Sequence, residues 1–253
     1  MADRPPTHTL VIGDSGAGKS TFAATYPKPM LVKAFDPFGK DMPYLKVAGT
    51  AVQPLYDIAP NVIAQDVVGA KSGHLRIRIE HYNDADMTNP VAYAAFLKSM
   101  VEFNPAEWAT IVLDSVTYAE LAARKWHQYG LNKTAKDPRQ WFGGSTDLLE
   151  EMLMGRLSAL PINVVVIAHI DEEKDEVHGT FVRSPKAPGR LRKGLPSAFG
   201  EVYRAYIGKD DAGERAHLLQ TASDNVWQAM SGIGAPNPAL PHYKALWPSE
   251  AAV

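Results

Sequence analysis

Residues 13–20 read Gly-Asp-Ser-Gly-Ala-Gly-Lys-Ser and match the phosphate-binding pattern G-x-x-x-x-G-K-[ST]. Glycines at these spacings let the backbone turn so that consecutive N–H groups point toward a phosphate chain. Lys19 is expected to contact the β- and γ-phosphates, and the Ser20 hydroxyl is expected to coordinate Mg²⁺. The pattern predicts a nucleoside triphosphate site. Its expected binding residues are Gly13, Asp14, Ser15, Gly16, Ala17, Gly18, Lys19, Ser20 and Thr21.

The segments on either side of this loop fit such a site. Residues 10–12, Leu-Val-Ile, predict a strand that leads into the loop, and residues 20–26 predict a helix that leaves it. A strand, a glycine loop and a helix in this order are the context in which the pattern binds phosphate. A chance glycine turn would not require these neighbours.

A carboxylate that could share the metal stands about a hundred residues later. Residues 110–113, Thr-Ile-Val-Leu, predict a buried parallel strand that delivers Asp114 at its carboxyl end, where parallel sheets place their ligands. Asp114 is therefore a candidate Mg²⁺ ligand beside Ser20. The alternative is that Asp114 only caps the helix that follows it.

Composition gives few further constraints on function. The chain has 253 residues, 45% hydrophobic and 21% charged, with a net charge of −2 and no cysteine. A disulfide framework, thiolate catalysis and cysteine-ligated zinc are thereby excluded. No apolar targeting segment or membrane-length run is present, so we expect a cytoplasmic protein with no membrane partner.

Apolar strands alternate with helical runs, which predicts an α/β fold with a mostly parallel, twisted sheet flanked by helices. Strands at 201–208 and 215–221, joined by a polar turn, predict antiparallel pairing near the C-terminus. We expect one core at 1–232 with an insert at 41–89, then a tail at 233–253 rich in Pro, Gly and Ala. Within the insert, residues 75–80 alternate with period two, which indicates a strand with one solvated face.

Several of these features together resemble the phage-encoded RecA-like ATPases, core-only relatives of RecA and RadA. They are the phosphate-binding loop, Leu113-Asp114-Ser115, the strand at 164–169, Pro188-Gly189-Arg190 and Phe199-Gly200-Glu201-Val202. The similarity spans residues 7–36 and 109–222. It implies a RecA-like P-loop core, ATP and Mg²⁺ as cofactors, and action on single-stranded DNA in recombination or annealing in the infected bacterial cytoplasm. It also implies self-association into a ring or filament, with a single-strand-binding protein as a further partner.

Two departures from that family predict slow hydrolysis. Where the family has a glutamate that polarises the attacking water, this chain has Phe38. Asp36 could replace that base, or it could simply initiate the turn before Pro37. Residues 228–232 also lack the Lys-x-Arg with which relatives reach the γ-phosphate of a neighbouring subunit. His169 stands where the family has a polar γ-phosphate sensor, so the candidate catalytic residues are Lys19, Asp36, Asp114 and His169.

The resemblance places a DNA-binding segment after the sensor strand, at 183–193. Five cations and no acid occur there, in a stretch that proline and glycine are expected to keep irregular: Arg183, Lys186, Arg190, Arg192 and Lys193. A second polar segment, 124–142, mixes cations with aromatic residues that could stack on bases or pack under the sheet. The alternatives are a solvated surface loop at 183–193, an assembly protein that has lost turnover, or a small-molecule kinase whose lid is 183–193.

Overall fold

Strands and helices alternate along the part of the chain that the computed structural model describes, residues 4–37, 39–134, 137, 139–174, 181–210, 212–224 and 226–247. The strands are β1 (His8–Gly13), β2 (Met30–Ala34), β3 (Thr50–Val52), β4 (Tyr56–Ala59), β5 (Val62–Gly69), β6 (Leu75–Tyr82), β7 (Thr110–Asp114), β8 (Asn163–Ala168), β9 (Ile170–Lys174), β10 (Phe181–Pro185), β11 (Glu201–Lys209), β12 (Arg215–Gln220) and β13 (Met230–Ser231). The α-helices are α1 (Lys19–Ala23), α2 (Met42–Leu45), α3 (Ala92–Val101), α4 (Val116–Lys125), α5 (Arg139–Glu150) and α6 (Gly189–Gly194). Shorter helical turns are η1 (Pro105–Glu107), η2 (Trp126–Leu131), η3 (Glu151–Arg156), η4 (Leu157–Ala159), η5 (Leu195–Ala198) and η6 (Tyr243–Leu246).

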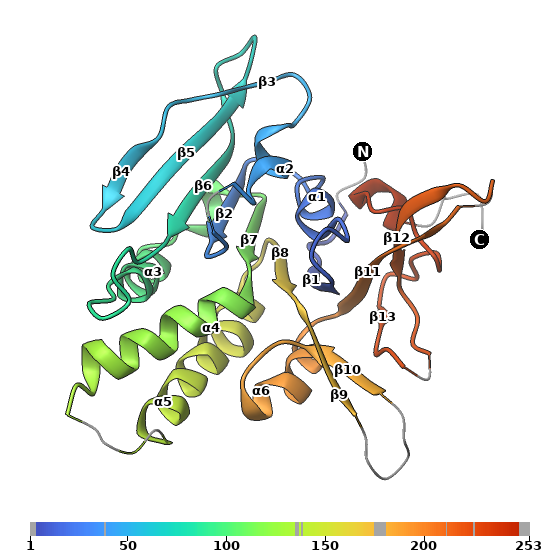
Figure 1. Ribbon diagram of the computed structural model, residues 1–253. Helices are drawn as coiled ribbons and strands as arrows, with labels where there is room; N and C mark the ends of the chain where they lie inside the picture. The colour runs from blue at the N-terminus through green and yellow to red at the C-terminus, as the bar shows by residue number, and fades with distance from the viewer. Residues whose placement is uncertain are drawn as a thin grey trace.

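One sheet crosses the described structure in the order β12-β11-β1-β8-β7-β2-β6-β5-β3, with β13 on β11 and β4 on β5 (Figure 1). The strands from β11 to β6 pair in parallel, whereas β12 and β13 at one end run antiparallel to β11. The predicted α/β class, with antiparallel strands near the C-terminus, is confirmed. The insert adds antiparallel strands of its own, because β5 pairs antiparallel with β6, β3 and β4.

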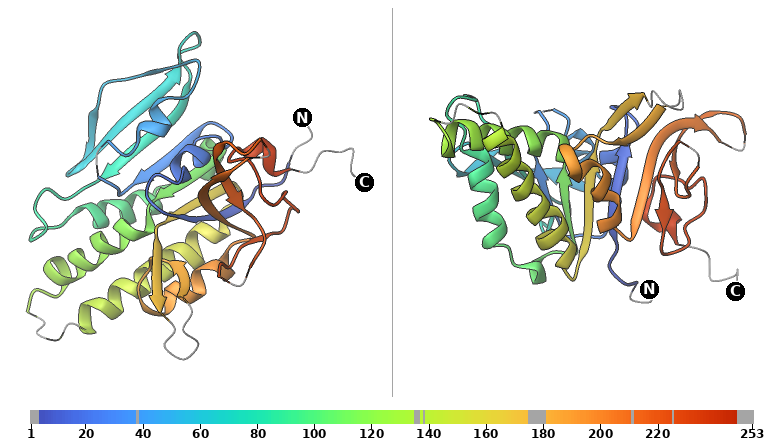
Figure 2. Two further views of the ribbon diagram at one scale, coloured as in Figure 1. Left: turned by 45° about the vertical axis from the view of Figure 1, so that its right-hand side comes forward. Right: turned by 90° about the horizontal axis from the view of Figure 1, so that it is seen from below.

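Helices cover both faces of this sheet, as the views in Figure 2 show. On one face, Leu10 and Ile12 of β1 pack in a core with α3, α4, α5 and α6. On the other face, Val11 packs in a second core with α1, α2 and η6. Successive strand residues point to opposite faces, so strands that are apolar throughout fill both cores. Among the described helices, none has the length and apolar character needed to cross a membrane.

The segment at 183–193, expected to be irregular, is partly strand and partly helix. It begins within β10, which pairs antiparallel with β9, and residues 189–194 form α6, with Leu191 buried. The expectation that proline and glycine keep this stretch irregular is therefore wrong, because Pro188 sits at the helix N-cap rather than inside the helix. The end of the polar segment at 124–142 belongs to α5, which begins at Arg139, and Gly144 lets α5 pass close to the His127 ring.

The chain after residue 232, predicted as a tail, packs on the sheet where the structure describes it. Ala239 bridges Leu219 of β12, and the Tyr243 ring lies 4.7 Å from that of Tyr26 between ring centroids. Leu246 is fully buried in the core with α1. The division into a core and a tail stays a prediction, but these residues contribute to the same core.

We expect Leu246→Ala to lower the free energy of unfolding by about 2–5 kcal/mol, because it removes a fully buried side chain. Leu240→Ala is the matched control, because Leu240 is 61% exposed in the same segment and its truncation should change stability by less than about 0.5 kcal/mol. Urea denaturation of both variants measures the difference. Equal stabilities would show that the segment after 232 does not contribute to the core.

Candidate functional site

The phosphate-binding loop, residues 13–20, joins β1 to α1 at the carboxyl end of the parallel strands. A Cβ atom at Gly13 would lie 2.6 Å from the Ala205 carbonyl oxygen of β11, so only glycine permits the pairing of the two strands there. Gly16 and Gly18 have φ angles of 81° and 94°, in the left-handed region that side chains disfavour. The backbone of the loop therefore requires glycine at these three positions.

Lys19 lies across the loop with its ammonium buried. Its Nζ donates to the carbonyl oxygens of Gly13, at 2.9 Å, and Asp14, at 2.8 Å. Burial lowers the pKa of Lys19, and the nearby carboxylates of Asp114 and Asp36 partly oppose that shift. A cation held at this point faces the space above the loop, where phosphate oxygens would be bound.

The buried Asp114 carboxylate at the end of β7 joins three elements. Its Oδ2 accepts hydrogen bonds from Ser20 Oγ, at 2.7 Å, and from the Tyr44 hydroxyl of α2, at 2.8 Å. Burial and the neighbouring Asp36 carboxylate raise the pKa of Asp114 to about 6, against the opposing effect of the two hydrogen bonds. Tyr44 was not identified from the sequence, because a tyrosine in a short helix carries no motif.

Asp36 and His169 lie at the neighbouring strand ends. Asp36 Oδ1 accepts a hydrogen bond from Ser115 Oγ at 2.6 Å. His169 follows β8, and its Nδ1 is buried without a hydrogen-bond partner in the described structure. Burial lowers the pKa of His169, and the charge of Lys19 adds to the effect. A neutral imidazole therefore lies beside this cavity with a ring nitrogen free to bond. Phe38 is outside the described residues.

One cavity of about 270 Å³ brings the predicted catalytic residues together. Lys19, Asp36, Asp114 and His169 all line it. Lys40 and His217 line it too, and the sequence analysis identified neither. Lys40 follows Asp36 in the same strand-end turn and could have been found there. His217 arrives from β12, where its Nδ1 lies 3.1 Å from the Ala17 carbonyl oxygen, and only the strand pairing places it there.

The cations expected to bind DNA lie apart from that cavity, on the β9–β10 hairpin and α6. Three of these cations form ion pairs: Arg183 with Glu172 at 2.5 Å, Arg192 with Asp171 at 2.8 Å, and Arg190 with both Asp147 and Glu150 at 2.8 Å. Lys186 and Lys193 have no acidic partner among the described residues. The segment at 124–142 is also internally paired, since Arg124 bonds to Glu120 and lies over the Phe142 ring.

The fold and the loop define a P-loop nucleotide-binding domain. Residues 6–231 match the AAA domain family, and the chain belongs to that family. The match runs through the insert at 41–89, which the resemblance to RecA-like ATPases had left uncovered. No curated protein matches the sequence.

Many solved structures are similar to this chain, including the following two. The flagellar accessory protein FlaH from Methanocaldococcus jannaschii is 10% identical, with a TM-score of 0.46 over 93% of this chain and 84% of FlaH. An ATPase from the type III secretion system of pathogenic bacteria is 15% identical, with a TM-score of 0.46 over 79% of this chain and 52% of the ATPase. The family match confirms the predicted P-loop nucleotide-binding domain. A RecA-like type, a phage source and an annealing function stay predictions.

The donor set beside Lys19 fits a magnesium ion held together with phosphates. Mg²⁺ is usually bound through one or two carboxylates, substrate phosphates and water rather than by a cage of protein ligands. Ser20 and Asp114 supply one hydroxyl and one carboxylate, already in contact. Within the described residues no cluster of three or more metal-binding side chains exists, so the protein alone offers no complete metal site.

We expect Tyr44→Phe to weaken Mg²⁺-dependent nucleotide binding by about tenfold, because partners that orient a metal ligand typically contribute that much to metal affinity. Nucleotide affinity in EDTA should stay unchanged. Tyr56→Phe is the matched control, since Tyr56 donates to Asp66 at an exposed site on β4. Calorimetric titration with and without Mg²⁺ measures the effect. Equal losses with and without the metal would mean that Tyr44 acts only on the fold.

Proposed function

We propose that this protein binds ATP with Mg²⁺ at the cavity above the phosphate-binding loop and hydrolyses it slowly. The observation that carries the proposal is the 2.7 Å contact between Ser20 and Asp114, 94 residues apart in the chain and both beside Lys19. The loop would bind the triphosphate, with Lys19 donating to its β- and γ-oxygens. Mg²⁺, held by Ser20 and Asp114, would neutralise phosphate charge.

Slow hydrolysis follows from the groups available to activate water. Phe38 stands where the resemblance expects a glutamate, so Asp36 is the carboxylate left to orient the attacking water. One of its oxygens is already engaged by Ser115, which fixes the carboxylate at the rim of the cavity. His169 lines the same cavity and would bond to the γ-phosphate from a ring nitrogen, since burial favours the neutral ring, which donates from one nitrogen.

We expect Lys19→Ala to weaken ATP binding by about 10- to 100-fold, because it removes a charge-assisted hydrogen bond of about 1.5–3 kcal/mol. Lys98→Ala removes a lysine that is 76% exposed on α3 and should leave ATP affinity unchanged. Calorimetry measures binding, and phosphate release measures turnover, which should stay below the rate of about 1–100 per second typical of kinases. Wild-type affinity in Lys19→Ala would contradict the assignment of this site.

A second candidate function is binding of single-stranded DNA, in recombination or annealing of the phage type, by the segment at 183–193. A direct backbone contact favours it, because the Lys186 N–H donates to the His169 carbonyl oxygen at 2.7 Å. A change at the γ-phosphate could therefore reach the segment through a single hydrogen bond. The three arginines of this segment are already paired with acids. They can contact DNA only if its phosphates displace those acids.

The salt dependence of DNA binding will show whether those pairs open. Each phosphate neutralised on a single strand contributes about −0.7 to the slope of log affinity against log salt, so five cations predict about −3.5 and the two lysines alone about −1.4. We expect Lys186→Ala plus Lys193→Ala to flatten the slope by about 1.4 while ATP affinity stays unchanged. Lys98→Ala is the control. An unchanged slope would show that neither lysine contacts DNA.

The remaining alternatives differ in what stimulates turnover. A single-stranded DNA partner predicts faster ATP hydrolysis when DNA is added, and a small-molecule kinase predicts phosphate transfer to a metabolite instead. An assembly protein predicts nucleotide-dependent self-association, as a ring or filament, with no turnover. Recruitment of a single-strand-binding protein belongs only to the DNA-binding alternative.

A further inference from the structure

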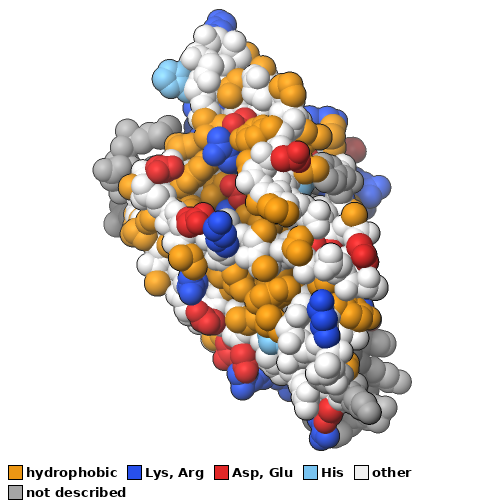
Figure 3. Space-filling model, turned by 90° about the vertical axis from the view of Figure 1, so that its left-hand side faces the viewer, with side chains coloured by type: hydrophobic (Ala, Val, Ile, Leu, Met, Phe, Trp, Pro, Cys, Tyr) orange, Lys and Arg blue, Asp and Glu red, His pale blue; other side chains and the backbone are white. Residues whose placement is uncertain are grey.

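A cavity of about 610 Å³ opens on the face of the sheet opposite α1, well within the size range of sites for small molecules. It lies between β2 and β6 on one side and α3 and η1 on the other, and the β4–β5 hairpin closes one end. Its walls combine apolar side chains, among them Leu31, Val62 and Trp108, with polar and charged ones. Figure 3 shows this side of the molecule, where hydrophobic side chains gather with charged ones between them. Nothing in the proposed nucleotide site uses this cavity.

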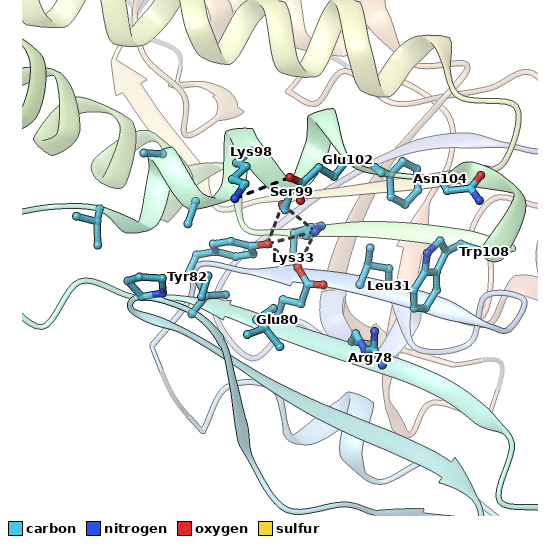
Figure 4. Close-up of a pocket in the computed structure, with 18 of the residues that line it drawn as sticks. Leu31, Lys33, Arg78, Glu80, Tyr82, Lys98, Ser99, Glu102, Asn104 and Trp108 are labelled. Atoms are coloured by element: carbon cyan, nitrogen blue, oxygen red, sulfur yellow. Dashed lines mark hydrogen bonds and ion pairs between the residues drawn. The ribbon is translucent and has the colours of Figure 1, made fainter.

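Lys33 forms the polar floor of the cavity (Figure 4). Its side chain is 3% exposed, and its Nζ donates to Glu80 Oε2 at 2.6 Å, to Ser99 Oγ at 3.0 Å and to the Tyr82 hydroxyl at 3.2 Å. A lysine ammonium has three protons, and all three are engaged. Lys33 therefore has no donor left for an anionic ligand.

Glu80 is the group at the floor that still has hydrogen-bonding capacity. Its Oε2 accepts bonds from Lys33 and from the Tyr82 hydroxyl, the latter at 2.5 Å. Its Oε1 has no hydrogen bond among the described residues. In Figure 4 this second oxygen points away from Lys33 toward the space beside Leu31 and Trp108. The floor of the cavity thus offers a ligand one negatively charged acceptor, Glu80 Oε1, and Lys33 offers it no free donor.

The cations at the rim of the cavity, like Lys33 at the floor, are already paired with acids. Arg78 pairs with Asp66 at 2.8 Å, and Lys98 lies 3.9 Å from Glu102. The cations that line the cavity therefore already have acidic partners. Burial also lowers the pKa of Lys33, and Glu80 opposes that shift. An ion pair buried in this way stabilises a fold no better than apolar residues of the same size, which favours a functional reason for it.

We propose that this cavity binds an amine or guanidine carried on an apolar body. The cationic N–H group would donate to Glu80 Oε1, and the body would pack against Leu31, Val62 and Trp108. The same chemistry is offered by a small aromatic or aliphatic amine and by a lysine or arginine side chain flanked by apolar residues in a polypeptide. The site is separate from the nucleotide cavity, and its test does not depend on nucleotide binding.

Calorimetric titration of the whole chain with two probes tests this proposal and separates the two sources. The probes are 2-phenylethylamine and the peptide acetyl-Leu-Arg-Leu-amide, and 3-phenylpropanoate is the control of similar shape and opposite charge. We expect at least one cationic probe to bind with a dissociation constant of about 1 mM or lower, and the anion at least tenfold more weakly. Binding of the amine alone indicates a small-molecule ligand, and tighter binding of the peptide indicates a polypeptide.

Variants locate the binding to this cavity. Glu80→Gln should weaken the cationic probe at least tenfold, whereas Glu102→Gln, which removes a charge 65% exposed at the rim, should change its affinity less than about threefold. Ala95→Phe is the second variant, because it adds a large side chain to the cavity from α3 and should abolish binding while ATP affinity is retained. The proposal is overturned if neither cation binds, if the anion binds equally well, or if Ala95→Phe leaves the affinity unchanged.

Discussion

The buried carboxylate of Asp114 is the constraint on which the arrangement of the nucleotide cavity depends. A buried carboxylate requires hydrogen-bond donors, and Ser20 and Tyr44 are the two described side chains that donate to its Oδ2. β1 and β7 are not neighbours in the sheet, because β8 lies between them. The loop must therefore extend over the end of β8 for Ser20 to reach Asp114, which brings Lys19 and His169 to the same cavity. The insert at 41–89 also contacts Asp114, because Tyr44 is one of its residues.

The parts of the site that could be predicted are those whose causes are local in sequence. The glycines of the phosphate-binding loop are required by left-handed backbone angles and by one close backbone approach. Asp114 ends a strand whose preceding residues, 111–113, are all apolar. Tyr44 and His217 could not be predicted, because a packing contact from a four-residue helix and an antiparallel strand pairing bring them to the loop. Neither cause leaves a trace in the residues nearby.

The sequence of the basic segment at 183–193 indicates a run of free cations. Charges counted along the chain do not show which acids the fold brings to them. The window at 183–193 contains no acid, yet Arg190 pairs with Asp147 and Glu150 of α5, about forty residues away. The same packing explains the helix there, because burying Leu191 against the core with α4 and α5 favours one helical turn despite the neighbouring glycine and proline. With the acids that pair with it, the surface around residues 183–193 has a net charge closer to neutral than the segment's own sequence indicates.

β2 connects the two cavities. Its residues alternate between the faces of the sheet, so Leu31 and Lys33 point into the α3 side while the strand continues to Asp36 at the nucleotide cavity. On β6, the alternation that predicted a solvated face places Arg78 and Glu80 toward the same cavity, and Glu80 is in register with Lys33. A central strand of a parallel sheet is normally apolar on both faces. The paired charges on β2 and β6 depart from that rule where the described sheet borders the cavity beneath α3, which accounts for polar side chains on two inner strands.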